Sequence, residues 1–362
     1  MANDTLEGSS SGGVTHLTRP ETDLVSAVES TLADFLAGQL AMLESVDPAL
    51  GYFGRTTRDL VLGGGKRLRP TFAYWGWRGI VGPDDPVEPV LPALAALELM
   101  HTFALVHDDV MDSSATRRGA PTAHRIFAAE HLSGGRMGDP EHFGATAAIL
   151  VGDLCLVWAD QLLARTPIST ATLFAVRACY DRMRIEAVAG QYLDVLGETQ
   201  PDVWSVERAL LVARHKTASY TVQRPLQFGL TLAGAEARSE VDAAYARYGT
   251  RVGEAFQLRD DLLGVYGDPA VTGKPAGDDL RTGKPTALLM LAQELATPEQ
   301  RVQLAECPTP NVITDTGAPA RIEELIKQRV EDGLAALDDA PIHAHARAAL
   351  THLAVAATHR PA

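Results

Sequence analysis

The chain has 362 residues, 46% of them apolar, and a formal net charge of −14. Such a chain can bury a large core, and its acidity argues against nucleic acid as a partner because no basic face compensates it. Cys155, Cys179 and Cys307 are odd in number and far apart, so neither a disulfide framework nor a thiolate zinc site is indicated. No run of about 18 uncharged apolar residues appears, so no membrane span is expected.

The first segment, residues 1–20, is rich in Ser and Gly and lacks a basic region followed by an apolar stretch. We expect a disordered tail rather than a secretory signal, and therefore a cytoplasmic protein. From residue 21 to 362 we expect one all-α domain, because apolar residues recur every three to four positions in segments such as 23–43 and 91–112. Ala and Leu, which favour helices, are abundant, and strand signals are few. The longest predicted loops are 113–145 and 267–284.

A glycine-rich basic motif, GGGKRLRP, occupies residues 63–70. Its glycines permit close approach of the backbone to an anion. Lys66 offers a point charge, and Arg69 offers a planar fork that matches phosphate oxygens. The spacing is not that of a Walker loop, so we interpret the motif as a phosphate contact of another kind. A flexible loop with surface charges is the alternative.

The helix predicted over 91–112 carries a first aspartate cluster, Asp108, Asp109 and Asp112 in HDDVMD. Asp108 and Asp112 lie one turn apart on the same face, and two carboxylates so close repel each other unless a cation lies between them. Magnesium prefers such hard oxygen ligands, completed by waters and phosphates. His101 falls on the same line of the helix. The cluster predicts a magnesium site, and a solvated acidic helix end is the alternative.

Cationic and hydroxyl side chains recur after this cluster. Singly, each is typical of a solvated surface, and their interest lies in the set. An anion held at the first cluster would need contacts of this kind: Arg117 and Arg118 in TRRG, Lys216 and Thr217 in HKTASYT, and Lys274 and Lys284 in the loop 267–284.

A second aspartate pair, Asp260 and Asp261, lies in EAFQLRDDLLGVYGD. Gln257 and Asp260 share one helix face with two glycines, and a polar and glycine stripe on a mostly buried helix is typical of a cavity wall. An ordinary amphipathic helix with exposed aspartates is the alternative. Two acidic helices facing each other could hold divalent ions between them and clamp a departing diphosphate.

Together the motifs resemble the trans-isoprenyl diphosphate synthase (polyprenyl synthetase) family. The match runs from about residue 21 to near the C-terminus, in the order GGGKRLRP, HDDVMD with RRG, GQYLD, HKTASYT, FQLRDDLLGVYGD and GKPAGDDLRTGKPT. This order is highly specific, unlike any one motif. The resemblance implies an isoprenoid-synthase fold, in which a single-domain helical bundle over residues 21–362 surrounds a deep central cavity, and a homodimer.

The resemblance also implies a reaction, the condensation of isopentenyl diphosphate with dimethylallyl, geranyl or farnesyl diphosphate and the release of diphosphate. It implies three magnesium ions ligated by Asp108, Asp112 and Asp260, with Asp109 and Asp261 as their neighbours in the catalytic set. Residues implied to contact the allylic substrate are Arg117, Lys216, Lys274, Thr217 and Gln257, with Lys284 as a further substrate-binding residue. Residues implied to hold isopentenyl diphosphate in a metal-free site are Lys66, Arg69, His101 and Arg118.

The second cluster departs from the family pattern, since Gly264 stands where a third aspartate is often found. Either Asp268 or Asp278 supplies the missing acid, or that position does not ligate metal directly. In the family, the residues before the first cluster form the cavity floor. Phe103 and Ala104 resemble the floor of geranylgeranyl diphosphate synthases, which implies a C20 product, with C15 or a product longer than C20 as the alternatives.

Two other functions share parts of this pattern. A class I terpene cyclase would need the metal-binding aspartates but would have no purpose for the set Lys66, Arg69 and Arg118, because it takes one diphosphate. A non-catalytic partner subunit of a prenyl synthase could lose the first aspartate cluster, which this chain keeps. Both features favour the coupling enzyme.

Overall fold

The computed structural model describes residues 19–200, 204–234, 239–267, 280 and 283–358. Within these ranges the regular structure is almost wholly helical, as expected for an all-α fold. The helices are α1 (Arg19–Val46), α2 (Leu50–Leu62), α3 (Leu68–Val81), η1 (Glu88–Val90), α4 (Leu91–Met111), α5 (Ala123–Ser133), α6 (Pro140–Ala164), α7 (Thr170–Thr199), α8 (Val206–Ala213), η3 (Arg214–Gln223), α9 (Arg224–Leu232), α10 (Ser239–Tyr266), α13 (Ala287–Leu295), α14 (Pro298–Glu306), α15 (Pro310–Asp315), α16 (Ala318–Ala335) and α17 (Ala344–Thr358). A short antiparallel hairpin pairs β1 (Thr116–Arg117) with β2 (Ala120–Pro121).

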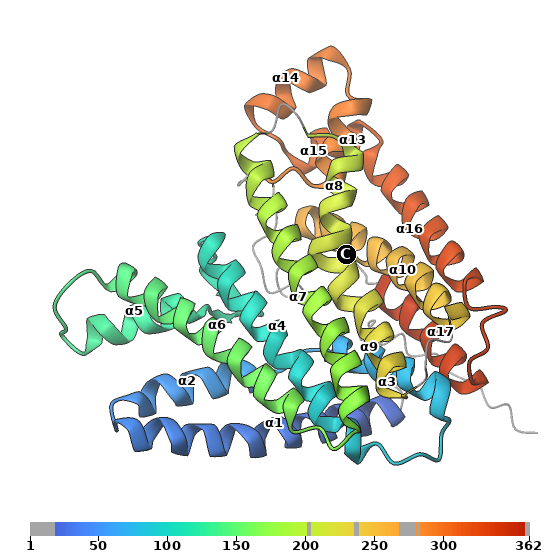
Figure 1. Cartoon of the computed structure of the whole chain (residues 1–362). Coiled ribbons are helices and arrows are strands. Elements are labelled where there is room, and N and C mark those ends of the chain that lie inside the picture. The colour runs from blue at the N-terminus through green and yellow to red at the C-terminus, as the bar shows by residue number, and fades with distance from the viewer. Residues whose placement is uncertain (1–18, 201–203, 235–238, 268–279, 281–282, 359–362) are drawn as a thin grey trace, which may run out of the picture.

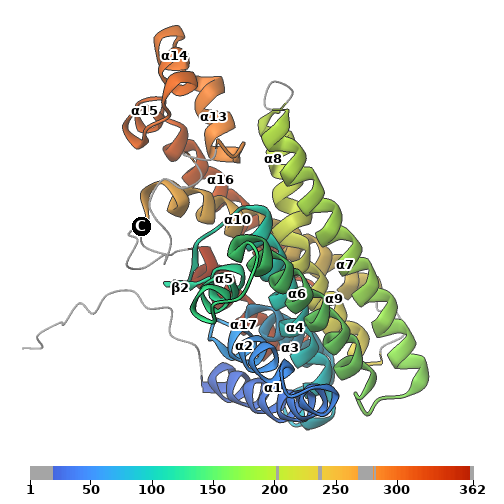
Figure 2. The same ribbon diagram turned by 90° about the vertical axis from the view of Figure 1, so that its left-hand side faces the viewer.

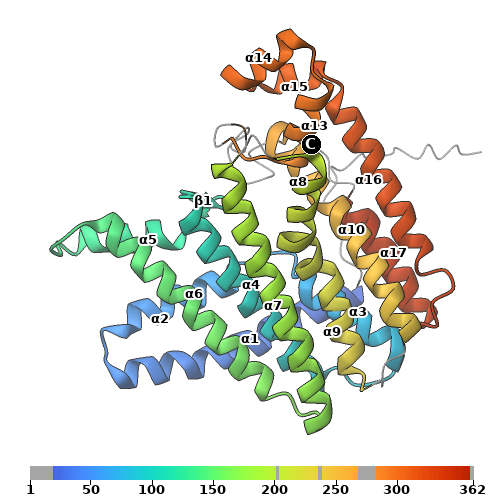
Figure 3. The ribbon, with the colours of Figure 1, turned by 45° about the horizontal axis from the view of Figure 1, so that its top comes forward.

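The long helices α4 and α10 lie inside the molecule (Figure 1), while α7 runs along one edge of it (Figure 2). Helices α1 and α2 cross one end of this bundle, and α13, α14 and α15 cover the opposite end (Figures 1 and 2). When the top is turned forward, α6 and α7 form the face nearest the viewer, while α16 and α17 flank α10 (Figure 3). The helices that carry the two aspartate clusters therefore lie at the centre of the bundle.

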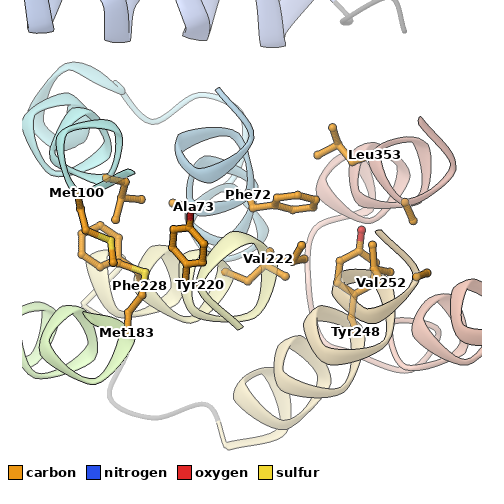
Figure 4. Packing of buried hydrophobic residues seen from close by; sticks show 14 of the residues in the cluster. Phe72, Ala73, Met100, Met183, Tyr220, Val222, Phe228, Tyr248, Val252 and Leu353 are labelled. Carbon is orange, nitrogen blue, oxygen red and sulfur yellow. The ribbon is translucent and has the colours of Figure 1, made fainter. Parts of the chain in front are cut away.

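The core is continuous across the central helices. Phe72 of α3, Met100 of α4 and Phe228 of α9 are fully buried, and Figure 4 shows them around the π-helical segment η3, which contributes Tyr220 and Val222. Fully burying one such side chain contributes roughly 1.5–3 kcal/mol. Because the site helices share this core, their positions are fixed relative to one another.

The predicted loop over 113–145 is wrong in part, because it contains the hairpin, helix α5 and the start of α6. Helix α5 buries His124, Phe127, Ala128 and His131, which follow the i, i+3, i+4, i+7 spacing of an amphipathic helix. The period is present in the sequence, but the surrounding glycines, prolines and charges obscure it. Residues 1–18, and thus most of the predicted tail, lie outside the described residues, and α1 begins at Arg19.

Two helical stretches are long and apolar enough to cross a membrane by length and composition alone, Glu88–Met111 and Pro140–Ala164. Within the protein, 67% of the first window and 50% of the second are buried, and a core helix of a water-exposed bundle has the same composition. The expectation that no segment spans a membrane stays a prediction.

Candidate active site

A cavity of about 1100 Å³ lies between α3, α4, α7, η3 and α10. The structure brings twelve of the residues singled out by sequence to its wall. They are Lys66, Arg69, His101, Phe103, Ala104, Asp108, Arg117, Arg118, Lys216, Thr217, Gln257 and Asp260. Segments that are far apart in the chain therefore meet around one space, as the deep central cavity of the prediction requires.

The first aspartate cluster lies at the C-terminal end of α4. Asp108 accepts hydrogen bonds from Lys216 Nζ at 3.0 Å and from Gln191 Nε2 at 3.1 Å on one carboxylate oxygen, and from Arg117 Nη2 at 3.1 Å on the other. Burial by itself would raise the pKa of Asp108, but Lys216, Lys284 and Arg117 lower this pKa to about 2. Asp108 is therefore ionised at any physiological pH.

Asp112 follows one turn later in a different environment. Burial raises its pKa, and the negative charge of Asp108 raises it further. Lys284 Nζ lies 3.5 Å from one of its oxygens. This is the repulsion expected of two carboxylates on one helix face, and a cation bound between them would relieve it.

Asp109, by contrast, is a buried residue of α4 that does not belong to the cavity wall. It accepts a hydrogen bond from Arg117 Nε at 2.7 Å, so the guanidinium of Arg117 bridges Asp109 and Asp108. The structure places Asp109 behind the site, where it orients Arg117.

Asp194 on α7 joins the two lysines of the site. One of its oxygens lies 2.5 Å from Lys216 Nζ and 2.8 Å from Lys284 Nζ. Burial would lower the pKa of Lys284, but Asp194, Asp112 and Asp108 raise it well above the usual range. Lys284 is therefore held as a cation beside the first aspartate cluster, and Lys216 is ion-paired to Asp108 and Asp194 in the same place.

A second part of the wall is basic. Arg118 donates a hydrogen bond to the carbonyl of Gly64, which ties the TRRG turn to the glycine-rich motif. Burial and the neighbouring cations lower the pKa of Arg118, although the negative charge of Glu98 opposes this shift. A lowered pKa is expected where cations are crowded together. Lys66 and Arg69 belong to the same wall, and a bound anion would stabilise the arrangement.

Arg67 within this motif has another role. Its backbone φ of 46° is left-handed, and its side chain is buried against Glu98, whose carboxylate oxygen lies 2.8 Å from Nη1. Arg67 therefore lines the cavity beside Lys66 and Arg69, but its guanidinium is paired with a buried carboxylate of the protein.

His101, Tyr220 and Arg69 form a group on the cavity wall, in which Tyr220 and Arg69 are buried and His101 is half-buried. His101 Nδ1 lies 2.9 Å from the Tyr220 hydroxyl, and the Arg69 guanidinium lies 4.0 Å from the centroid of the Tyr220 ring. Arg69 also donates to Thr221 Oγ1 at 2.9 Å. Desolvation, followed by the charge of Arg69, lowers the pKa of His101 well below its usual value, so the imidazole is neutral.

Lys216 and Thr217 lie on η3, which is π-helical rather than α-helical. Insertions of this kind recur at functional sites because they displace side chains from the regular spacing. Two glycines allow the segment to lie close to its neighbours. A Cβ at Gly190 of α7 would lie 2.4 Å from the backbone nitrogen of Lys216, and a Cβ at Gly253 of α10 would lie 2.5 Å from the Cβ of Ala218. The segment is therefore wedged between α7 and α10.

The second aspartate pair divides in the same way as the first. Asp260 lines the cavity together with Gln257, which agrees with the cavity face predicted for this helix. Asp261 is buried and accepts a hydrogen bond from Gln257 Nε2 at 2.8 Å. Lys274, Asp268 and Asp278 lie outside the described residues, so the source of a third acid at this cluster stays a prediction.

Sequence reasoning missed several residues of the site. Asp194 and Gln191 belong to the quoted motif GQYLD, and Tyr220 and Thr221 belong to HKTASYT, yet the sequence assigned no role to them. The motifs that contain these residues were recognisable in the sequence. The contacts that the residues make could not be predicted, because each contact joins helices that are distant in sequence.

The donor set suits magnesium completed by a substrate. Among the described residues, no three carboxylate, histidine or cysteine side chains converge closely enough to hold a metal on protein ligands alone. Magnesium is bound in many enzymes by one or two carboxylates plus substrate phosphate oxygens. Asp108, Asp112 and Asp260 offer carboxylate oxygens of this type, and the pKa of Asp112 is raised by burial and then by the neighbouring charge of Asp108.

Comparison with known proteins agrees with this geometry. The model of the polyprenyl synthetase family matches residues 52–327. A geranylfarnesyl diphosphate synthase of Aeropyrum pernix is 34% identical over 250 residues, which are 68% of this chain and 71% of that protein. A geranylgeranyl diphosphate synthase of Mycobacterium tuberculosis is 33% identical, covering 72% of this chain and 71% of that protein. An octaprenyl diphosphate synthase of Escherichia coli is also 33% identical, covering 75% and 76%.

Solved structures share the fold over nearly the whole chain. A geranylgeranyl pyrophosphate synthase of Corynebacterium glutamicum, complexed with isoprenyl diphosphate and magnesium, is 42% identical with a TM-score of 0.89, covering 94% of this chain and 99% of that chain. A geranylgeranyl pyrophosphate synthetase of Pyrococcus horikoshii is 26% identical with a TM-score of 0.75, covering 95% and 100%. The predicted isoprenoid-synthase fold is confirmed.

Proposed function

The chain belongs to the polyprenyl synthetase family and is a prenyltransferase, and from this premise we propose that it is a magnesium-dependent geranylgeranyl diphosphate synthase. It condenses isopentenyl diphosphate head-to-tail with dimethylallyl, geranyl or farnesyl diphosphate, releases diphosphate and stops at C20. One observation carries the proposal. A single cavity presents Asp108 and Asp260 together with the separate basic set Lys66, Arg69 and Arg118, so it provides for two diphosphates at once.

The carboxylate part of the wall suits the allylic substrate. Asp108, Asp112 and Asp260 would hold magnesium, which neutralises the diphosphate and makes it a better leaving group. Lys216 and Arg117 pair with Asp108, and Lys284 lies beside Asp112. Their fixed positive charge stabilises the negative charge that develops on the leaving group, because such preorganised charges need not reorganise during the reaction.

The basic part suits isopentenyl diphosphate without a metal. Lys66, Arg69 and Arg118 supply its charge, and His101 stays neutral because burial and Arg69 lower its pKa. The wall of the same cavity also has apolar residues, among them Ala187, Val188 and Phe256. An apolar wall keeps water from the allylic cation, and the proton lost after coupling goes to the released diphosphate.

The basic set also distinguishes this function from the two others. A terpene cyclase takes one diphosphate and would leave Lys66, Arg69 and Arg118 without an anion. A non-catalytic partner subunit would not require an ionised Asp108 held by Lys216, Arg117 and Gln191.

The C20 product is supported by Phe103 and Ala104, which line the cavity on α4 less than two turns before Asp108. A helical wheel alone does not place Phe103 on the line of Asp108. The similarity to geranylgeranyl synthases supports the same length, although relatives of near-equal identity are named for other products.

We infer that the protein is a homodimer through α6 and α7. The α7 residues Ile185, Val188, Tyr192 and Val195 are exposed large apolar side chains at spacings of three and four, which form one stripe on a helix. Ile149, Leu150 and Val157 are likewise exposed on α6. Contiguous exposed apolar surface of this kind marks protein interfaces.

Product analysis tests the proposed reaction. Purified protein is incubated with isopentenyl diphosphate, magnesium and each of the C5, C10 and C15 allylic diphosphates, and products are identified by mass spectrometry. We expect a C20 diphosphate from each starter, and no product from Asp108→Ala although that variant folds. Elongation to another length would keep the enzyme class and reject the floor assignment, whereas no elongation by the folded protein would reject the synthase.

Metal removal tests the magnesium requirement. In chelator, the carboxylates of Asp108, Asp112 and Asp260 lose the cation that we propose they share with the diphosphate. We expect turnover to disappear and to return on addition of magnesium, while circular dichroism is unchanged. Full turnover of a verified metal-free sample would contradict this part of the proposal.

A further inference from the structure

Phe103 has a neighbour on α4 that also lines the cavity. The ring of His107, one turn later, packs against the ring of Phe103 edge-to-face, with centroids 4.8 Å apart and planes at 67°. Edge-to-face pairs at this distance are favourable beyond the area they bury. Both rings belong to the cavity wall, so the position of one limits the rotamers available to the other.

His107 is itself held from behind by α6. Its Nε2 lies 2.9 Å from the carbonyl oxygen of Ile149, so the proton must be on Nε2 for a hydrogen bond to form. Asp153 Oδ1 lies 3.9 Å from the same nitrogen. The imidazole is therefore anchored to the backbone of α6 at one edge, while its ring contacts Phe103.

Gly152 makes this placement possible. A Cβ at Gly152 would lie 2.2 Å from His107 Cδ2 and Nε2, a distance that no pair of non-bonded heavy atoms tolerates. Any other residue at 152 would force the imidazole away from α6. Helix α6 thus has a site that accommodates His107, formed by the absence of a side chain at Gly152 and by the carbonyl oxygen of Ile149.

We propose that His107, seated on Gly152, is a positioning residue that fixes the ring of Phe103 and so sets how deep the apolar tail of the product can extend. The proposal rests on the proposed function, since it concerns where elongation stops. When the tail reaches a ring that cannot rotate, the next addition has no room. When the ring loses its neighbour, a second rotamer becomes available and the cavity deepens.

A purely structural role for His107 makes a different prediction. If the side chain merely tied α4 to α6, its removal would lower stability and turnover without changing the length of the product. Product length is a ratio between two fates of one bound intermediate, so it is independent of the amount of folded enzyme. The ratio therefore separates the two roles.

The test measures products from farnesyl diphosphate, isopentenyl diphosphate and magnesium for wild type, Phe103→Ala, His107→Ala and the double variant. We expect His107→Ala to raise the ratio of products longer than C20 to C20 by about tenfold or more, the range by which repacking an apolar pocket changes discrimination. Phe103→Ala should shift the ratio in the same direction. The double variant should add little to Phe103→Ala, because His107 acts through that ring.

Two further variants sharpen the test. Gly152→Ala displaces the imidazole without removing it and should also change the ratio. Asp153→Asn, whose side chain is largely exposed and makes no ring contact with Phe103, is the matched control and should leave the ratio unchanged.

Each failure has its own signature. An unchanged ratio in His107→Ala, beside a lengthened product in Phe103→Ala, would overturn the role of His107 and keep the floor. Unchanged ratios in both variants would overturn the floor and the inference together. A wild-type protein that elongates no starter would overturn the proposed function itself.

Discussion

Asp194 is a single carboxylate that holds two lysines of the site in place. Its carboxylate holds Lys216 at 2.5 Å and Lys284 at 2.8 Å, and these lysines in turn lie beside Asp108 and Asp112. Three carboxylates and two ammonium groups thus form one network. Removing a charge from such a network leaves its partners uncompensated.

We therefore expect Asp194→Asn to reduce turnover strongly while the protein still folds. The amide keeps the shape of the side chain but not its charge, so both lysines lose a fixed anchor. Misplacing catalytic groups by about 1 Å costs roughly a hundredfold in rate. Steady-state kinetics with each diphosphate varied, together with thermal denaturation, measure the effect.

Asp181→Asn is the control on the same helix. Asp181 pairs with Arg177 and Arg184 near the surface, where ion pairs contribute little. Its substitution should leave kinetics unchanged. Equal rates in wild type and Asp194→Asn would remove Asp194 from the site.

For single residues, the sequence predicted which residues belong to the site better than which side chains they contact. The spacing of Asp108 and Asp112 on one helix face was sufficient to predict neighbouring carboxylates, and the charge of Asp108 adds to the effect of burial in raising the pKa of Asp112. The division of each aspartate pair was not predictable: Asp109 orients Arg117 and Asp261 bonds Gln257. Which member of a pair faces the cavity depends on the rotation of the helix within the bundle.

Among the elements, the π-helical segment η3 contributes most to the geometry of the site. It carries Lys216, Thr217 and Tyr220, all of which line the cavity, and it lies between Gly190 and Gly253. The sequence HKTASYT has the composition of an ordinary helix. A π-helical turn contains an extra residue, and periodicity over so short a segment cannot reveal it. The glycines that accommodate it lie on other helices.

Gly190→Ala should therefore impair the site through the backbone of η3. The new Cβ would lie 2.4 Å from the Lys216 nitrogen and 2.7 Å from the His215 carbonyl carbon, and backbone atoms cannot move aside as a flexible side chain does. We expect a destabilisation of about 1–3 kcal/mol from overpacking and a loss of turnover larger than the loss of folded protein explains. Melting temperature and kcat of the folded fraction measure the two effects.

Gly38→Ala is the matched control. Gly38 lies in α1, and a Cβ added there would have no neighbouring atom within 4 Å, so the substitution should be neutral or stabilise the protein by roughly 0.5–1 kcal/mol. If Gly190→Ala behaved in the same way, η3 would have more room than its contacts indicate.

The whole molecule combines a negative net charge with a cavity whose wall carries many cationic side chains. Its net charge is −14, yet one space is lined by Lys66, Arg67, Arg69, Arg117, Arg118 and Lys216. The all-α class was predictable because helix-favouring composition and period agree along the chain. The loop prediction over 113–145 failed because turn-forming residues around α5 outweighed its short apolar period.

The apolar stripe on α7 is only partly explained within one chain, since Val188, Tyr192 and Val195 line the cavity but Ile185 does not. Ile185 is 69% exposed and Tyr192 is 68% exposed, and the described residues of this chain leave the stripe open to solvent. A second copy placed against α6 and α7 would bury it. Such burial contributes roughly 25 cal/mol for each Å² of apolar surface removed from water.

We expect Ile185→Glu to convert the proposed dimer into a monomer, because a charge buried at the proposed interface without a partner costs several kcal/mol. Ile185 does not line the cavity, so the change acts on association first. Size-exclusion chromatography with light scattering measures the mass.

Val302→Glu on α14 is the control, since Val302 is similarly exposed, at 57%, but lies at the far end of the bundle. A dimer that survives Ile185→Glu would move the interface elsewhere. A monomer with the unchanged fold would place α7 at the interface, and its residual activity would then show how far Val188 and Tyr192, which line the cavity, depend on the partner's presence.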